Sequence, residues 1–166
     1  MRVFIIVIVV LVILLYTQYY YKYNPEYTIV QAYLQDFDGQ LLYEKNPIVI
    51  YDQIYNIQDL FETVLAYSYM FKKDVIVNTE LVTKCMHKYF IMWSDEGEAV
   101  VKLINPKFKN EIKGQIADSN VNYVTVKLKE KQVLIVPALW YYYTENKNIS
   151  AIGLDDLVSF LVYKVF

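Results

Sequence analysis

The sequence is poor in the residue types on which most catalytic and metal sites depend. Its 166 residues include a single cysteine, Cys85, a single histidine, His87, and only four glycines and four prolines. A single cysteine excludes an intrachain disulfide framework and a cysteine-based zinc site within one chain. Because the glycines stand far apart, there is no glycine-rich phosphate-binding loop, and nucleotide chemistry is not expected.

An excess of positive charge is also lacking. The chain has 16 basic and 18 acidic residues, which gives a formal net charge of −2. A protein whose main partner is nucleic acid usually presents a strong basic field. We therefore expect no nucleic acid among the partners.

Long apolar side chains and tyrosine are abundant instead. Across residues 3–16, the only polar side-chain group is the hydroxyl of Tyr16. With the residues that follow, this run reaches about 19 residues, close to the length that a helix needs to cross ~30 Å of hydrocarbon. We expect residues 1–23 to form a retained, single-pass membrane anchor. The side chains expected at its membrane–water boundaries are Arg2, Tyr19, Tyr20, Tyr21 and Lys22.

The same run has two other interpretations. A cleaved secretory signal also begins with a basic residue and an apolar stretch, but residues 19–25 lack the small residues that a signal peptidase accepts. A buried strand would suit the β-branched residues, but strands average ~5–6 residues, and the remaining chain is too small to cover both faces of this one. Arg2 and Lys22 flank the run, so charge alone leaves the orientation in the membrane open.

Residues 24–166 are enough for one domain, which we expect to be mainly β with helices, an α+β class. Asn56 is a suitable N-cap for a helix that starts at Ile57, has apolar residues at helical spacing up to Tyr69 and ends at Lys72 and Lys73. Strands are predicted at residues 27–34, 48–51, 86–93, 98–104, 123–128 and 133–137.

Turns and the C-terminal pattern complete the predicted domain. Residues 94–97 predict a hairpin turn between two of the strands. The apolar spacing from Leu154 to Val165 predicts a C-terminal helix capped near Asp155, with a strand as the alternative. Several short antiparallel strands with a helix before them favour a β-sandwich or jelly roll.

Three stretches of the domain resemble, in order, the strands of cupin and JmjC-like jelly-roll domains, particularly the small cupin-like members. They are residues 46–50 (NPIVI), residues 89–106, which hold the turn at 94–97, and residues 133–140 (VLIVPALW). The resemblance covers about half of the domain. It implies a cupin-like jelly roll over residues 24–166.

The resemblance also implies iron held by two histidines and a carboxylate, and here the sequence departs from the family. Tyrosines occupy the late histidine position, and one chain with only His87 cannot form a two-histidine set. A substituted metal site of His87, Asp95 or Glu96 and a tyrosine is an alternative. Cys85 lies two positions from His87, which on a strand would put both side chains on one face, although a buried thiol is favoured. We expect no catalytic residue, metal or cofactor.

The most aromatic run lies late in the domain. On a strand, alternation would bury two of its four rings and present the other two outward. Exposed tyrosine and tryptophan are enriched at protein interfaces. The candidate interaction residues are Trp140, Tyr141, Tyr142 and Tyr143.

These features predict a membrane-anchored, non-catalytic structural or docking protein whose partners are the lipid bilayer and other structural proteins. An N-terminal anchor, a small cupin-like domain and a bias toward residues with AT-rich codons look like the small membrane proteins of large DNA viruses. That resemblance implies a minor component of the internal virion membrane that contacts capsid proteins. The alternatives are a divergent cupin-like, metal-dependent oxygenase or isomerase, and a small-ligand or carbohydrate-binding module.

Overall fold

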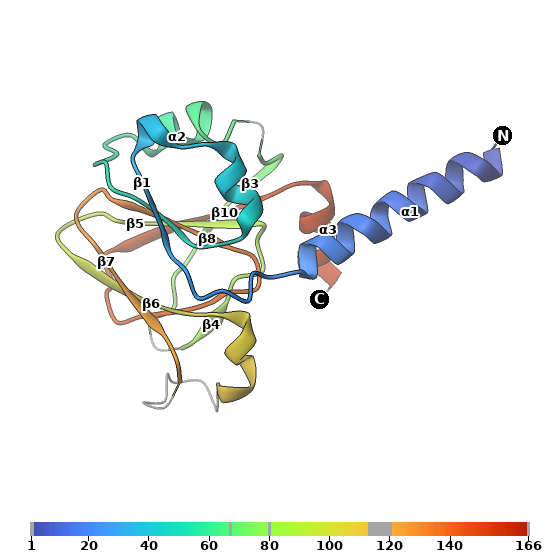
Figure 1. Cartoon of the computed structure of the whole chain (residues 1–166). Coiled ribbons are helices and arrows are strands. Elements are labelled where there is room, and N and C mark those ends of the chain that lie inside the picture. The colour runs from blue at the N-terminus through green and yellow to red at the C-terminus, as the bar shows by residue number, and fades with distance from the viewer. Residues whose placement is uncertain (1, 67, 80, 113–120, 166) are drawn as a thin grey trace.

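The computed structural model describes residues 2–66, 68–79, 81–112 and 121–165. A long N-terminal helix, α1 (Arg2–Tyr21), extends away from a domain built on two β-sheets (Figure 1). This arrangement confirms the predicted class, α+β with an apolar N-terminal helix and a β-rich domain. The helix is long and apolar enough over Phe4–Tyr21 to cross a membrane, by length and composition.

The larger sheet has six strands in the order β1-β2-β8-β5-β10-β3, and the smaller has four in the order β4-β9-β6-β7. The strands of the larger sheet are β1 (Val30–Ala32), β2 (Ile48–Ile50), β3 (Phe71–Val75), β5 (Tyr89–Ser94), β8 (Val133–Pro137) and β10 (Ile149–Asp155). Those of the smaller sheet are β4 (Thr83–Lys84), β6 (Ala99–Ile104), β7 (Val124–Leu128) and β9 (Tyr141–Thr144). Among the described strands, β1 and β2 pair in parallel and the other pairs are antiparallel.

The main core lies between the two sheets. Alternate residues of β5, such as Phe90 and Met92, meet Leu103 of β6 and the fully buried Trp140 there. The opposite face of the larger sheet is covered by α2 (Ile57–Thr63) and by the 3-10 segment η2 (Gly39–Glu44). The domain therefore has three layers, a helical layer and two sheets, and the outer face of the smaller sheet has no helix over it in the described part of the chain.

Several predicted elements are confirmed. The side chain of Asn56 accepts a hydrogen bond from the N–H of Gln58 at 3.1 Å and caps α2 as expected. Strands β2, β5, β6, β7 and β8 fall within a residue or a few residues of their predicted positions. These segments carry their own signals, because a cap residue or a β-branched run acts locally.

Two predictions at the level of elements are wrong, and a third is confirmed with a shifted start. The helix after Asn56 ends at Thr63, and residues 71–75 form the edge strand β3, which pairs with β10. The predicted C-terminal helix is present as α3 and is capped by Asp156, but it begins at Leu157 and ends at Val165, because Leu154 and Asp155 belong to β10. Residues 94–97 form no hairpin, because β5 and β6 lie in different sheets and the turn carries the chain from one sheet to the other. The positive φ of Gly97, 65°, gives this turn its sharp change of direction.

Candidate functional site at the junction of α1 and the domain

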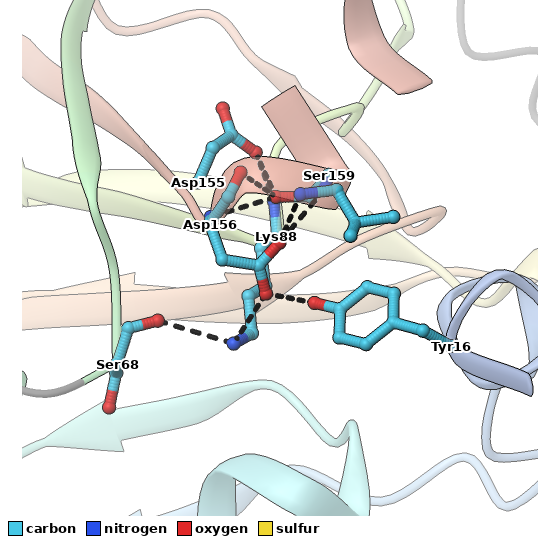
Figure 2. Close-up of polar contacts among 7 residues, drawn as sticks. Tyr16, Ser68, Lys88, Asp155, Asp156 and Ser159 are labelled. Carbon is cyan, nitrogen blue, oxygen red and sulfur yellow. Dashed lines mark hydrogen bonds and ion pairs between the residues drawn. The ribbon is translucent and has the colours of Figure 1, made fainter. Parts of the chain in front are cut away.

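The last turns of α1 are bonded to the domain by a polar network. The hydroxyl of Tyr16 donates a hydrogen bond to Oδ2 of Asp156, which also forms an ion pair with Nζ of Lys88 at 3.0 Å. Nζ of Lys88 donates a second bond to the carbonyl oxygen of Ser68 at 3.2 Å. Figure 2 shows Tyr16 on α1 pointing directly at Asp156, with Lys88 between Asp156 and Ser68. The network thus joins α1, the segment before β5 and the loop before β3.

Asp156 is placed by the start of α3. Its Oδ1 accepts hydrogen bonds from the N–H groups of Val158 at 3.1 Å and Ser159 at 2.9 Å, as an N-cap carboxylate does. Burial by itself raises the pKa of this carboxyl, but bonds from Ser159, Tyr16 and Lys88 outweigh burial and hold the pKa below its ordinary value. The carboxylate is therefore ionised at neutral pH and remains an acceptor for Tyr16.

Tyr20 makes the apolar contact between α1 and the domain. Its ring is 3% exposed and packs on Ala138 and Leu139, and its hydroxyl donates a hydrogen bond to the carbonyl oxygen of Met86. Tyr16 packs against the same small cluster. One side of the last two turns of α1 is consequently covered by protein.

Lys45 closes the C-terminal end of α1. Its Nζ donates hydrogen bonds to the carbonyl oxygens of Tyr19, of Tyr20 at 3.0 Å and of Lys22 at 2.6 Å. Carbonyls at a helix C-terminus lack intrahelical partners and carry partial negative charge, so a lysine ammonium is a favourable cap. Burial, reinforced by the positive charges of Lys22 and Lys88, lowers the pKa of Lys45 to about 8. The ammonium form still predominates at neutral pH.

Residues with a strained backbone conformation also lie at the junction of α1 and the domain. Three non-glycine residues in the described part of the chain have positive φ, namely Lys45 (56°), Lys131 (62°) and Leu139 (74°). Two of these three, Lys45 and Leu139, contact α1. A left-handed conformation costs a bulky residue free energy and persists only where the surroundings hold it. For Lys45, the indole Nε1–H of the buried Trp140 donates to its carbonyl oxygen at 3.2 Å and helps to hold it.

The segment that follows α1 is also attached to the domain. The side-chain amide of Asn105, which is fully buried, donates to the carbonyl oxygens of Asn24 at 3.0 Å and Glu26 at 3.2 Å. The hydroxyl of Tyr27 donates to the carbonyl oxygen of Leu103 at 2.8 Å, and its ring stacks on Trp140. No free linker separates the helix from the sandwich in this structure.

The predicted membrane-boundary residues therefore divide into two groups. Tyr20 faces the domain, and Tyr19 is partly held there by the ammonium of Lys45, 4.2 Å from its ring centroid. Tyr21 and Lys22 are exposed. The side chain of Arg2 lies outside the described part of the structure.

The four aromatic candidates alternate as predicted. Trp140 and Tyr142 are buried in the core, whereas Tyr141 and Tyr143 are half-buried on the outer face of the smaller sheet. Nζ of Lys102 lies 5.5 Å from the ring centroid of Tyr143 and 5.1 Å from that of Tyr123 on the same face. Only Tyr141 and Tyr143 of the run are thus available to a partner.

The residues of the substituted metal site are not brought together. His87 lies just before β5 and Asp95 just after it, and a strand of this length separates its ends by about 17 Å. Within the described part of the chain, no three His, Cys, Asp or Glu side chains gather where they could hold a metal ion. Cys85 and His87 do not share a strand face either, because both lie in the segment between β4 and β5. Cys85 belongs to the core between the sheets, where burial raises the pKa of its thiol.

His87 instead forms a buried pair with Asp155, with 2.6 Å between Nδ1 and Oδ2. Ser159 Oγ donates to the other carboxylate oxygen of Asp155 at 2.9 Å. The serine and the histidine therefore both bond to the aspartate, which is not the arrangement in which a histidine activates a serine nucleophile. Gly153 is required beside this pair, because a Cβ there would lie 2.5 Å from three atoms of the imidazole ring.

No protein-family model matches the chain, and neither does any curated protein. The cupin-like resemblance therefore stays a prediction. The tyrosines at the end of α1 were predicted from the sequence, but their partners Lys45, Lys88 and Asp156 were not. A lysine or an aspartate in a loop carries no local signal that it will bond to a helix far away in the chain.

Proposed function

We propose that this protein is a membrane-anchored, non-catalytic docking protein in which α1 and the β-sandwich act as one rigid unit. The observation that carries the proposal is the junction, where Tyr16, Tyr20 and Lys45 fasten the end of α1 to the domain. A flexible tether would need none of these bonds. A fastened helix that spans the bilayer sets the orientation of the domain against the membrane surface.

The surface that would meet a partner is the outer face of the smaller sheet. Tyr141 and Tyr143 are half-buried there, and Tyr123 and Lys102 lie beside them. Half-exposed tyrosines with a nearby cation supply contact area at low entropic cost. The resemblance to small membrane proteins of large DNA viruses makes capsid components of a virion the first class of partner to test.

The rigid unit can be tested by distance measurement on the full chain in lipid nanodiscs. Spin labels on Leu11→Cys in α1 and Lys147→Cys at the far end of the sandwich should give one narrow distance distribution, because the junction holds the helix. Both positions are exposed, whereas Cys85 is 2% exposed and escapes labelling.

Weakening the junction provides the comparison. Adding Tyr20→Ala and Lys45→Met should broaden the distribution, while Lys129→Met, at an exposed lysine away from α1, should leave it unchanged. A broad distribution in the unmodified chain would contradict the proposal.

A divergent enzyme is the second candidate, and one observation favours it. His87 and Asp155 line a cavity of about 430 Å³ together with Phe71, Lys72 and Phe160. An imidazole oriented by a carboxylate is an arrangement that general bases use. Stoichiometric iron, manganese or zinc in the purified protein, lost on His87→Ala, would support the metal-dependent form of this candidate.

The ligand-binding alternative receives less support. Buried side chains of both sheets fill the inter-sheet core, which is the interior that such a module would use. In the described part of the chain, the cavity beside His87 and the larger one of about 790 Å³ beside Leu34 and Asp52 both lie outside that core.

A further inference from the structure

We propose that α3 lies against the same bilayer that α1 spans, with Leu157 and Leu161 in contact with lipid. This inference rests on the proposed membrane anchor and extends it. It assigns to the C-terminal helix a role as a second, interfacial membrane contact. Three features of the chain support it: the length of α1 that is free of the domain, the position of α3 and the apolar residues on the exposed side of α3.

The free part of α1 is short for a bilayer. Fourteen residue steps separate the charged Arg2 from Tyr16, whose hydroxyl is bonded to Asp156. At ~1.5 Å per residue they span about 21 Å, roughly 9 Å less than the ~30 Å hydrocarbon core. Thinning of the bilayer and snorkelling of Arg2 can offset part of this difference, and a bilayer of ordinary thickness that is not thinned reaches toward the surface of the domain next to Tyr16.

The part of the domain that lies next to Tyr16 is α3. The helix starts directly after Asp156, the residue that holds Tyr16, and it contacts α1. Figure 1 shows α3 crossing beside the end of α1 that is nearest the domain. Lipid that reaches past Tyr16 on this side meets α3 before the sheets.

The described side chains on the outer face of the first turns of α3 are apolar. Leu157 and Leu161 are each 52% exposed, and they lie one helical turn apart on the same side. Ser159, the polar residue between them, is fully buried and bonded to Asp155. Exposed leucines at helical spacing are unfavourable in water, whereas a helix that lies in the membrane interface buries such a face in lipid. The apolar residues of α1 from Phe4 to Leu15 are exposed as well.

Depth-dependent fluorescence quenching of the full chain in phosphatidylcholine vesicles tests the proposal. An environment-sensitive fluorophore is attached to Leu157→Cys, Leu161→Cys, Leu11→Cys or Lys147→Cys, and the unmodified chain, with its buried Cys85, gives the background. Vesicles carry a doxyl quencher at a shallow or a deep position of the acyl chain. The substituted side chains are exposed, so all four variants should fold.

We expect blue-shifted emission at positions 157 and 161, with about twofold loss of intensity with the shallow quencher and less with the deep one. Leu11→Cys should be quenched most by the deep quencher, and Lys147→Cys by neither. Emission at 157 and 161 equal to that at 147, with position 11 still quenched, would overturn the contact of α3 and leave the anchor in place. A blue shift at 157 and 161 without quenching would mean that a second copy or another protein covers α3, and it would overturn the proposal too.

Failure of the anchor gives a different result. If position 11 is not quenched and alkaline carbonate strips the chain from vesicles, then α1 does not span the bilayer, and the proposed function fails together with this inference.

Discussion

Asp156 joins three parts of the chain through a single carboxylate. It accepts from Tyr16 on α1, pairs with Lys88 before β5 and caps the first turn of α3. These bonds hold its pKa below the ordinary value against the opposing effect of burial. Because each bond is made to the charged form, loss of the charge weakens all three at once.

Asp156 should therefore make the junction sensitive to acid. A carboxylate with a lowered pKa stabilises the folded state above its unfolded pKa, and this contribution is lost as the pH falls through the folded value. The free energy of unfolding of the full chain, measured by urea in detergent, should differ between the unmodified protein and Asp156→Asn by a constant amount from about pH 7 to pH 5. The difference should shrink below about pH 4.

The asparagine keeps the helix cap, so that the comparison isolates the charge. Asp38→Asn, at an exposed cap of η2, is the matched control and should show no such change. If Asp156→Asn and Asp38→Asn shift stability alike at every pH, Asp156 does not have this role.

Gly153 should be intolerant of even one added carbon. Its hydrogen faces the ring of His87, and a Cβ 2.5 Å from three ring atoms would displace the buried imidazole from Asp155. Gly153→Ala should lower the free energy of unfolding by about 1–3 kcal/mol, as overpacking of a core does. Gly39→Ala, where a Cβ meets nothing within 4 Å, is the control for urea unfolding. Equal midpoints for the two variants would show that the imidazole moves without penalty.

At the scale of elements, the end of α1 depends on residues that are distant in the chain. The side chain of Lys45 bonds to three carbonyls of residues 19–22, and the ring of Tyr20 covers Leu139. A helix of ordinary composition ends with its own capping residues. Here η2 and the turn between β8 and β9 supply the cap and the docking surface instead.

Loss of this cap should loosen the docking of α1 without unfolding the sandwich. Lys45→Met keeps the aliphatic part of the side chain but removes the donor, and it should lower the free energy of unfolding by about 1–2 kcal/mol. Hydrogen exchange at the amides of residues 17–22 should rise, because the last turn of α1 frays. Lys129→Met is the matched control. Unchanged exchange at residues 17–22 would contradict the capping role of Lys45.

An element could be predicted from the sequence where the pattern that favours it lies within its own residues. The apolar run of α1, the Asn56 cap of α2 and the β-branched runs of β2 and β8 are local features, and each predicted its element. The edge strand β3 has the sequence FKKDV and is formed by its pairing with β10. Leu154 fits an apolar helix face by spacing, yet it pairs with Tyr89 in the sheet. Tertiary pairing overrode local preference at both sites.

At the scale of the whole molecule, α1 has an exposed apolar part and a part that contacts the domain. Residues 4–15 of the helix are exposed, whereas Tyr16 and Tyr20 belong to the domain by their contacts. A chain cut at Asn24 would expose Ala138 and Leu139 and would leave Lys45 and Asp156 without their partners on α1. A chain that starts at Tyr16 would keep these contacts and lose the apolar run.

Truncation should reveal this boundary. The chain that starts at Tyr16 should be soluble without detergent, and its Tm should exceed that of the chain that starts at Asn24 by about 5 °C, since burial of Tyr20 is worth ~2 kcal/mol. Thermal unfolding followed by circular dichroism measures the difference. Adding Tyr20→Ala to the longer chain should remove most of it. Equal Tm values for the two lengths would place the boundary at Asn24 instead.

The sequence by itself determined that the chain has one long apolar helix, that the rest is rich in strands, and that a single histidine and a single cysteine limit its chemistry. These properties depend on composition and on neighbours in the chain. Only the tertiary structure decided that β5 and β6 belong to different sheets, that His87 pairs with Asp155, and that Tyr16 bonds to Asp156. The reason is physical: each of these contacts joins segments whose meeting depends on how the two sheets pack, and no short stretch of sequence carries that information.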